Sequence, residues 1–327
     1  MRRGIRVLPR GILAALIAVN VVLLFMLFRP DRVLTAQPAD QGSSDGGLPT
    51  VKSSPVTTSS PSTSSGQTSA GPGTSADSAP SVRPVDPAPA ERLLLATSST
   101  TAWRATVGDC NTPGKIERST DGGASWKGIV RTGSAPIVIL GAEPGGDLFT
   151  IGGTGQTCSV RSVAYASDGT VIASSTSPAN EWFSTPHNRD EINGPGGTRA
   201  TPCEGHVVGF APLNPSRAVV ICDSGAAMSS RNSGNTWRQL ARIPNTLAVS
   251  AGSGTYWLAS TSQDCDGVTV QSLTEKSGDL SRGRTRCARG LGVASGQVAF
   301  DVTGGGTIWL WSGDRVAVSK DGGKTWT

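Results

Sequence analysis

Near its carboxyl end the chain reads Ser319-Lys320-Asp321-Gly322-Gly323-Lys324-Thr325-Trp326. Two earlier stretches, 119–126 and 230–237, follow the same pattern, S-x-[DN]-x-G-x-[ST]-W. Aspartate or asparagine can accept hydrogen bonds from backbone N–H groups in a tight turn, and glycine adopts positive φ without steric cost. Tryptophan adds a large apolar group at the start of the outgoing strand. The pattern predicts three structural hairpin turns, built on Ser119, Asp121, Gly123, Trp126, Ser230, Asn232, Gly234, Trp237, Ser319, Asp321, Gly323 and Trp326.

This motif resembles the Asp-box, or BNR repeat, of the propellers of sialidases and of photosystem II assembly factors. The resemblance covers the head of the chain, residues 92–327, and implies an all-β fold, a β-propeller. It also implies that the motif lies on the rim of the propeller, away from any catalytic centre. We therefore expect these residues to be structural and not catalytic.

The spacing of the motif tryptophans predicts the number of blades. The gaps are 111 and 89 residues, and a four-stranded blade takes about 44 residues. The second gap fits two blades, and the first fits two blades plus an insertion. This predicts about five blades, possibly six if the insertion hides one. Short β-rich runs between Gly and Asp residues mark further strands, at 137–140, 147–151, 163–167, 247–249, 255–259, 268–270, 298–300, 307–311 and 315–318.

A propeller exposes open edges unless its first and last blades join. The last motif is followed by a single residue, Thr327. We therefore expect a segment near Arg83–Leu95 to complete the last blade. The alternative is a truncated domain.

The six cysteines predict three disulfides. All of them lie in the head, which we expect to be exported, and none has the CxxC spacing of zinc or redox sites. Six cysteines allow fifteen pairings. We prefer neighbours in the sequence, with Cys203–Cys222 and Cys265–Cys287 ahead of Cys110–Cys158.

The segments before the head predict a membrane anchor and a stalk. Gly11–Phe28 is an uncharged run that would form about 27 Å of helix, close to the hydrocarbon thickness of a membrane. Four arginines within residues 1–10 and two after the run place the N-terminus in the cytoplasm and the head outside. Cleavage after Ala36, as in a signal peptide, is the rival interpretation. Residues 35–91 are rich in Ser, Thr, Pro, Gly and Ala, which is typical of a disordered linker.

Charge and motif content exclude several functional classes. The head holds 21 basic and 18 acidic residues, and apart from one short arginine-rich segment its charges are mixed, which disfavours nucleic acid as a partner. The G-x-S-x-G, P-loop and HExxH motifs are absent from the head. His187, Glu204 and His206 lack the spacing of metal ligands on a helix. We expect no cofactor and no metal.

A carbohydrate-active hydrolase is the alternative function. A sialidase needs an arginine cluster and a tyrosine nucleophile, but the two tyrosines of the chain, Tyr165 and Tyr256, both lie within expected strands. The Arg242-Ile243-Pro244 segment differs from the family's pattern because it follows the second motif and has Ala241 before it. A glycosidase with two carboxylates could use Asp190 and Glu191 or the acids at 264 and 266. Adjacent carboxylates in polar loops are more often solvated surface.

Two segments are candidates for binding. Pro186–Gly205, with Asp190 and Glu191, interrupts the blade spacing, and long loops on a rigid scaffold commonly carry function. In the second segment Arg282, Arg284 and Arg286 would point one way if they lie on one strand, forming a ladder suited to anionic groups. The competing interpretation is that charges on an outer strand prevent edge pairing.

Together these features predict a bacterial, membrane-anchored propeller outside the cytoplasm. We expect it to be a non-enzymatic binding or scaffolding module for protein or a cell-envelope polymer. An arginine cluster facing paired carboxylates in the central funnel would favour an enzyme. A funnel of serine, glycine and apolar residues would favour binding.

Overall fold

A computed structural model of the protein describes residues 88–129, 136–142, 147–154, 157–175, 181–184, 190–252, 254–276 and 279–327. These residues form 23 strands. Within these ranges no helix is long and apolar enough to cross a membrane. The expected anchor at 11–28, and nearly all of the expected linker at 35–91, lie outside the described residues.

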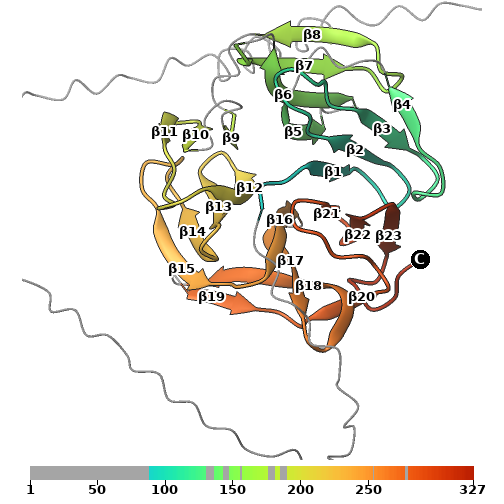
Figure 1. Ribbon diagram of the computed structural model, residues 1–327, viewed down its shortest axis with the longest axis vertical. Helices are drawn as coiled ribbons and strands as arrows, with labels where there is room; N and C mark the ends of the chain where they lie inside the picture. The colour runs from blue at the N-terminus through green and yellow to red at the C-terminus, as the bar shows by residue number, and fades with distance from the viewer. Residues whose placement is uncertain are drawn as a thin grey trace, which may run out of the picture. The chain divides into compact units, whose positions relative to one another are not determined.

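The strands form six antiparallel sheets arranged as the blades of a β-propeller (Figure 1). Within each blade the chain runs from the innermost strand outward. The first blade is β1 (Arg92–Ala96), β2 (Ala102–Thr106), β3 (Ile116–Ser119) and β4 (Lys127–Ile129); the second is β5 (Ile137–Ala142), β6 (Leu148–Thr154), β7 (Ser159–Tyr165) and β8 (Val171–Ser175); the third is β9 (Phe183–Ser184), β10 (Glu191–Gly194) and β11 (Gly197–Ala200).

The fourth to sixth blades follow the same plan. The fourth is β12 (Val207–Asn214), β13 (Arg217–Cys222), β14 (Ala226–Ser230) and β15 (Arg238–Arg242); the fifth is β16 (Thr246–Gly252), β17 (Thr255–Ser262), β18 (Cys265–Lys276), β19 (Asp279–Arg282) and β20 (Arg286–Arg289); the sixth is β21 (Val298–Val302), β22 (Ile308–Ser312) and β23 (Arg315–Ser319).

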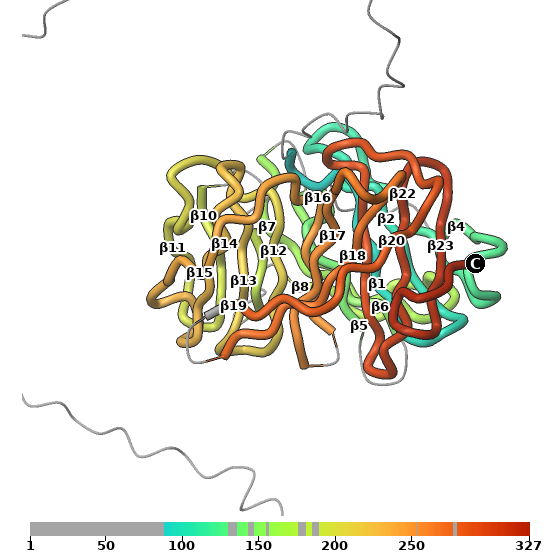
Figure 2. Tube along the Cα trace, turned by 90° about the horizontal axis from the view of Figure 1, so that it is seen from below, coloured from blue at the N-terminus to red at the C-terminus, as the bar shows by residue number. Residues whose placement is uncertain are grey.

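The innermost strands β1, β5, β9, β12, β16 and β21 form a closed ring, since each contacts the next and β21 contacts β1. In the side view of Figure 2 the inner strands run along the height of the propeller. The apolar core lies between neighbouring blades, where the facing sheets pack together. The all-β propeller fold is confirmed, with the larger of the two expected blade numbers.

The blade that raises the number from five to six is the short third blade. Its hairpin β10–β11 lies within Pro186–Gly205, the stretch that the sequence marked as an insertion. Ile192 is the only aliphatic side chain in β10, and it is buried with Trp182. This blade therefore holds its place through two large side chains and not through an alternating apolar pattern.

The expected closure of the ring is wrong. Arg92–Ala96 does not complete the last blade, because it forms β1 and pairs with β2 of its own blade. The sixth blade has three strands among the described residues. Thr327 begins a further edge, exchanging two backbone hydrogen bonds of 3.0 Å with Val318. The first and last blades therefore join without sharing a strand.

Side chains make the joint between the first and sixth blades. Trp309 of β22 is fully buried, donates a 2.9 Å hydrogen bond from Nε1 to Ser98 O, and meets the Trp126 ring edge-on at 6.3 Å between centroids. The Arg104 guanidinium lies 4.3 Å from the Trp126 ring centroid and 5.0 Å from that of Trp311. Cation–π contacts of this kind stabilise partly desolvated interfaces. Aromatic burial thus takes the place of a shared strand.

The three expected disulfides are confirmed, with the preferred pairing. Cys110–Cys158 joins the first and second blades, with 5.4 Å between the Cα atoms. Cys203–Cys222 fixes the segment that leads into the fourth blade, and Cys265–Cys287 joins β18 to β20. Each bridge restricts the unfolded chain and so favours the folded state.

The three motifs form turns with the same hydrogen bonds. In the first motif the Gly123 N–H donates to Ser119 Oγ at 2.9 Å, and the Ser125 N–H donates to Asp121 Oδ1 at 3.0 Å. The equivalent bonds occur in the motifs at 230–237 and 319–326. The Ser125 hydroxyl and N–H groups lower the pKa of the Asp121 carboxyl to about 2. The charged form of this side chain is thus part of the turn.

Each motif also faces the preceding blade around the ring. The glycine at the fifth position of each motif has φ between 83° and 90°, and a Cβ there would lie 2.9–3.2 Å from a side chain of that blade: Trp309 for Gly123, Trp182 for Gly234 and Arg286 for Gly323. The motif tryptophans pack in the same direction, as Trp237 does edge-on against Trp182. Glycine is required here by both the backbone conformation and the close approach.

Candidate functional site

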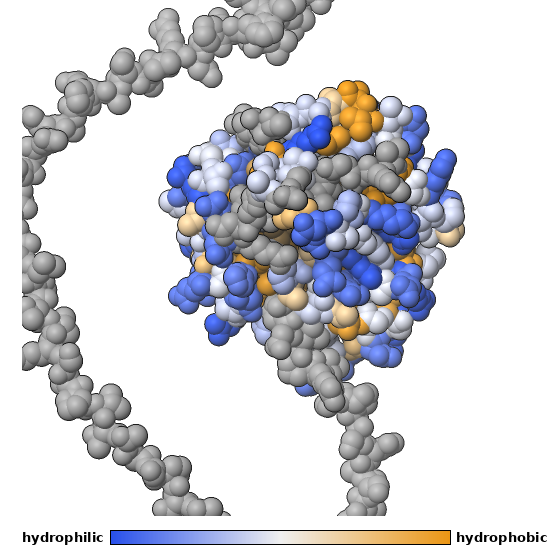
Figure 3. Space-filling model, turned by 45° about the horizontal axis from the view of Figure 1, so that its top comes forward, coloured by the Kyte–Doolittle hydropathy of each residue, from blue (hydrophilic) through white to orange (hydrophobic). Residues whose placement is uncertain are grey.

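An open cavity of about 350 Å³ lies at the centre of the ring. Residues from all six innermost strands line it, and its volume is within the range of ligand sites in proteins. The apolar side chains in its wall include Leu93, Val138, Leu140, Phe210 and Val249. The outer surface seen in Figure 3 is by contrast mostly hydrophilic, with small hydrophobic areas. The cavity is therefore the candidate binding site of the propeller.

The polar side chains that line the cavity are few: Arg92, Ser184, Ser250 and Asp301. Arg92 is held in the wall, since Nη2 donates to Gln297 Oε1 at 3.2 Å and the guanidinium lies 4.5 Å from the Trp311 ring centroid. Asp301 is the only carboxylate among the described residues of the lining. Hydrolysis of a glycosidic bond commonly needs a pair of carboxyl groups, and the described lining presents one.

Asp301 lies where three blades meet. It belongs to β21, accepts a 2.8 Å hydrogen bond from the Ala96 N–H at the end of β1, and accepts a 2.7 Å bond from the Ser250 hydroxyl of β16. Burial raises the pKa of the Asp301 carboxyl to about 6, because desolvation disfavours the charged form, although these hydrogen bonds act in the opposite direction. The group therefore titrates within the cavity wall at mildly acidic pH.

Asp301→Asn should remove a pH dependence of stability. The carboxyl binds its proton more tightly in the folded protein than in the unfolded chain, where aspartate titrates near pH 4. The free energy of unfolding of the wild type should therefore rise relative to the variant by roughly 2–3 kcal/mol as the pH falls from about 6 to about 4. Asparagine keeps an oxygen acceptor for the Ala96 N–H. Denaturant unfolding at several pH values measures this difference, and parallel profiles would contradict it.

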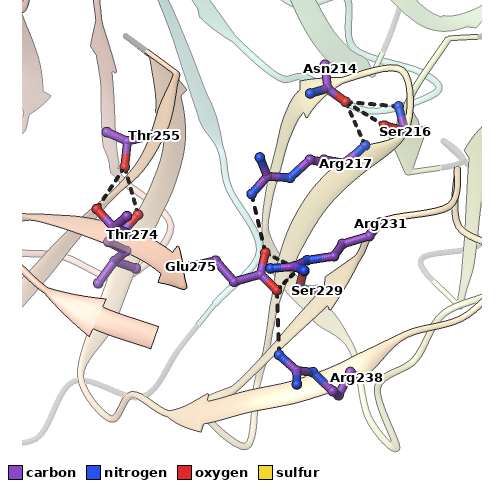
Figure 4. Close-up of polar contacts among 10 residues, drawn as sticks. Asn214, Ser216, Arg217, Ser229, Arg231, Arg238, Thr255, Thr274 and Glu275 are labelled. Carbon is purple, nitrogen blue, oxygen red and sulfur yellow. Dashed lines mark hydrogen bonds and ion pairs between the residues drawn. The ribbon is translucent and has the colours of Figure 1, made fainter. Parts of the chain in front are cut away.

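A second polar cluster lies between the fourth and fifth blades (Figure 4). Glu275 of β18 is 1% exposed, and its carboxylate receives Arg231 Nε at 2.9 Å, Arg217 Nη2 at 3.4 Å and Arg238 Nη2 at 3.6 Å. The Ser229 hydroxyl donates to it at 3.3 Å. The fourth blade supplies all these donors and the fifth supplies the acceptor, so the cluster is an ion-pair network across a blade interface.

This cluster is not the constellation that a sialidase requires. Tyr256, on β17, is fully buried, and burial raises the pKa of its hydroxyl to about 12. Burial also raises the pKa of Tyr165. Both shifts oppose formation of the phenolate that a tyrosine nucleophile needs.

The expected arginine ladder does not form. The segment is interrupted after Arg282, which ends β19, and Arg286 begins β20. Arg282 pairs with Leu273, which faces the fourth blade, whereas Arg286 pairs with Val270, which faces the sixth. Directly opposed residues share a face of a sheet, so these two arginines point to opposite faces. Arg284 lies exposed between the strands.

The acidic candidates are dispersed. Asp190 Oδ1 lies 3.3 Å from His206 Nδ1, and both side chains are more than half exposed. Glu191 begins β10, in the third blade, whereas the acids of the 264–266 turn belong to the fifth. His187 lies outside the described residues. Within the described ranges, no group of three His, Cys, Asp or Glu side chains is placed to hold a metal ion.

A six-bladed propeller with a central cavity lined mostly by apolar side chains is thus the class that fold and site define. No family model matches the chain, and no curated protein matches it. Among solved structures, the chain is similar to the fucose-specific lectin from Aleuria aurantia (11% identity, 72% of this chain and 92% of that chain, TM-score 0.45). It is also similar to the PQQ-bound aldose sugar dehydrogenase from Streptomyces coelicolor (10%, 70% and 90%, TM-score 0.46) and to YCF48 bound to D1 peptide (16%, 76% and 87%, TM-score 0.36). These likenesses concern the fold alone.

Proposed function

We propose that the protein is a bacterial, membrane-anchored β-propeller outside the cytoplasm that acts as a non-enzymatic binding or scaffolding module. Its ligand is a protein or a cell-envelope polymer. The observation that carries this proposal is the lining of the central cavity, whose side chains are mostly apolar and include a single described carboxylate, Asp301. Apolar walls with a few fixed polar groups are typical of binding sites.

The remaining support comes from the sequence. The run Gly11–Phe28 has the length and flanking charges of a signal anchor, and the Ser/Thr/Pro-rich segment after it has the composition of a spacer. The three disulfides suit an oxidising compartment. N-terminal sequencing tests the anchor, since a mature chain that begins near Gln37 would contradict it.

Photocrosslinking in cells tests the binding role of the cavity with the full chain. A benzoyl-phenylalanine in place of Phe210, which lines the cavity, should form an adduct with an envelope protein or polymer. The matched control carries the same group in place of Ile172, which is 56% exposed on the outermost strand β8. Equal yields at the two positions, or no adduct at Phe210, would contradict the proposal.

A further inference from the structure

The cluster around Glu275 leaves positively charged groups facing solvent. The Glu275 side chain is 1% exposed, whereas Arg231 is 52% and Arg238 is 55% exposed; Arg217 is one-third exposed. The carboxylate is therefore the buried part of this cluster, and the guanidinium groups form its solvent-exposed part. This Glu275 cluster lies between the fourth and fifth blades (Figure 4), and its residues are not among the described residues that line the central cavity.

One carboxylate serves several arginines. In the part of the chain that the structure describes, Glu275 is the only carboxylate within ion-pair distance of Arg217 and Arg231. Positive charge therefore exceeds negative charge among the described side chains of this cluster.

Two of the arginines, Arg217 and Arg231, also have hydrogen-bonding capacity to spare. Arg231 binds Glu275 through Nε, and no described residue accepts a hydrogen bond from its two terminal nitrogens. Arg217 Nε and the Tyr256 hydroxyl are buried without a hydrogen-bond partner among the described residues. Tyr256 lies close enough for the charges of Arg217, Glu275 and Arg231 to influence its pKa. Buried polar groups without partners are costly, so a ligand that supplies hydrogen bonds here would stabilise them.

We propose that the Glu275 cluster binds a doubly charged oxyanion, either sulfate or a phosphate group. Guanidinium groups form paired hydrogen bonds with tetrahedral oxyanions, and Arg217, Arg231 and Arg238 approach one point from separate segments of the fourth blade. Glu275 holds these groups together before the ligand arrives, which lowers the entropic cost of binding. A second negative charge then offsets the positive excess that Glu275 leaves.

Isothermal titration of the full chain in detergent tests this site, with inorganic phosphate and inorganic sulfate as probes and sodium chloride at equal ionic strength as the reference. Both probes should bind the wild type and raise its unfolding temperature beyond the effect of chloride. Arg231→Gln should weaken phosphate binding by about tenfold or more, because it removes one charge-assisted pair of hydrogen bonds. Arg238→Gln should weaken it in the same direction.

Arg284→Gln is the matched control, since Arg284 is exposed and is not part of the Glu275 cluster. The phosphate affinity of this variant should equal that of the wild type. Circular dichroism in chloride establishes that each variant folds. Glycerol phosphate distinguishes a free anion from a phosphate group carried on a larger molecule. The ester binds only if the Glu275 cluster is open to solvent on its outer side. The proposal would be overturned if the wild type bound neither probe, or if Arg231→Gln and Arg238→Gln both bound phosphate with the affinity of the wild type.

Discussion

Replacing Trp309 by alanine should lower the free energy of unfolding by about 3–5 kcal/mol, the cost expected for removing a fully buried aromatic side chain. Trp309 is 0% exposed and lies at the joint between the first and sixth blades. Its loss removes the edge-on contact with Trp126 and leaves Ser98 O without its donor. No shared strand compensates for these losses. Equilibrium unfolding in guanidinium measures the change.

Trp309→Phe is the matched variant, because it keeps an aromatic ring in the joint and removes only part of the volume and the Nε1 donor. Its loss should be clearly smaller than that of the alanine variant. Val171→Ala, at a side chain that is 52% exposed, should change stability by less than about 0.5 kcal/mol. A Trp309→Ala loss no larger than that of Val171→Ala would show that the joint is held by other means.

Glu275→Ala should give the second large effect, a loss of roughly 3 kcal/mol. Removing one partner of a buried ion pair leaves its counterpart without compensation, and here several arginines lose the same carboxylate. The expected loss lies at the lower end of the usual range because Arg231 and Arg238 are half exposed and can be solvated by water. Denaturant unfolding at low ionic strength measures it.

Glu204→Ala is the control for Glu275→Ala, since Glu204 is an exposed carboxylate in the same chain. Its effect should be under about 0.5 kcal/mol. A double-mutant cycle with Arg231→Ala should show that the two changes are not additive, because both remove the same 2.9 Å contact. Additive effects would show that the carboxylate acts independently of that arginine.

The sequence predicted the fold well where its signals were local. The motif turns combine hydrogen-bonding side chains and glycine within eight residues, and the strand-like runs at 137–140, 255–259 and 307–311 lie in β5, β17 and β22. The sequence did not predict the strands of the third blade, because β10 and β11 contain few branched or aromatic residues. The closure was mispredicted because β1 finds its partner in the next strand along the chain.

The candidate sites were harder to predict because they depend on distant residues. The arginines around Glu275 lie between 37 and 58 residues away from it in the sequence, and no local pattern links them. The arginine ladder had a local pattern, but the strand is interrupted between β19 and β20, and this interruption places Arg282 and Arg286 on opposite faces. The central cavity collects residues from six strands, so only the assembled ring defines it.

The direction in which the motifs pack has a consequence for the order of folding during synthesis. The motifs of the fourth and sixth blades contact blades that precede them in the chain, so their partners emerge first. The motif of the first blade is different, because Trp126 contacts Trp309, which follows it by 183 residues. This turn can make its contact with Trp309 only after nearly the whole domain has been synthesised. Ring closure is therefore the last step, and until then one side of the first blade presents an unsatisfied aromatic surface to solvent.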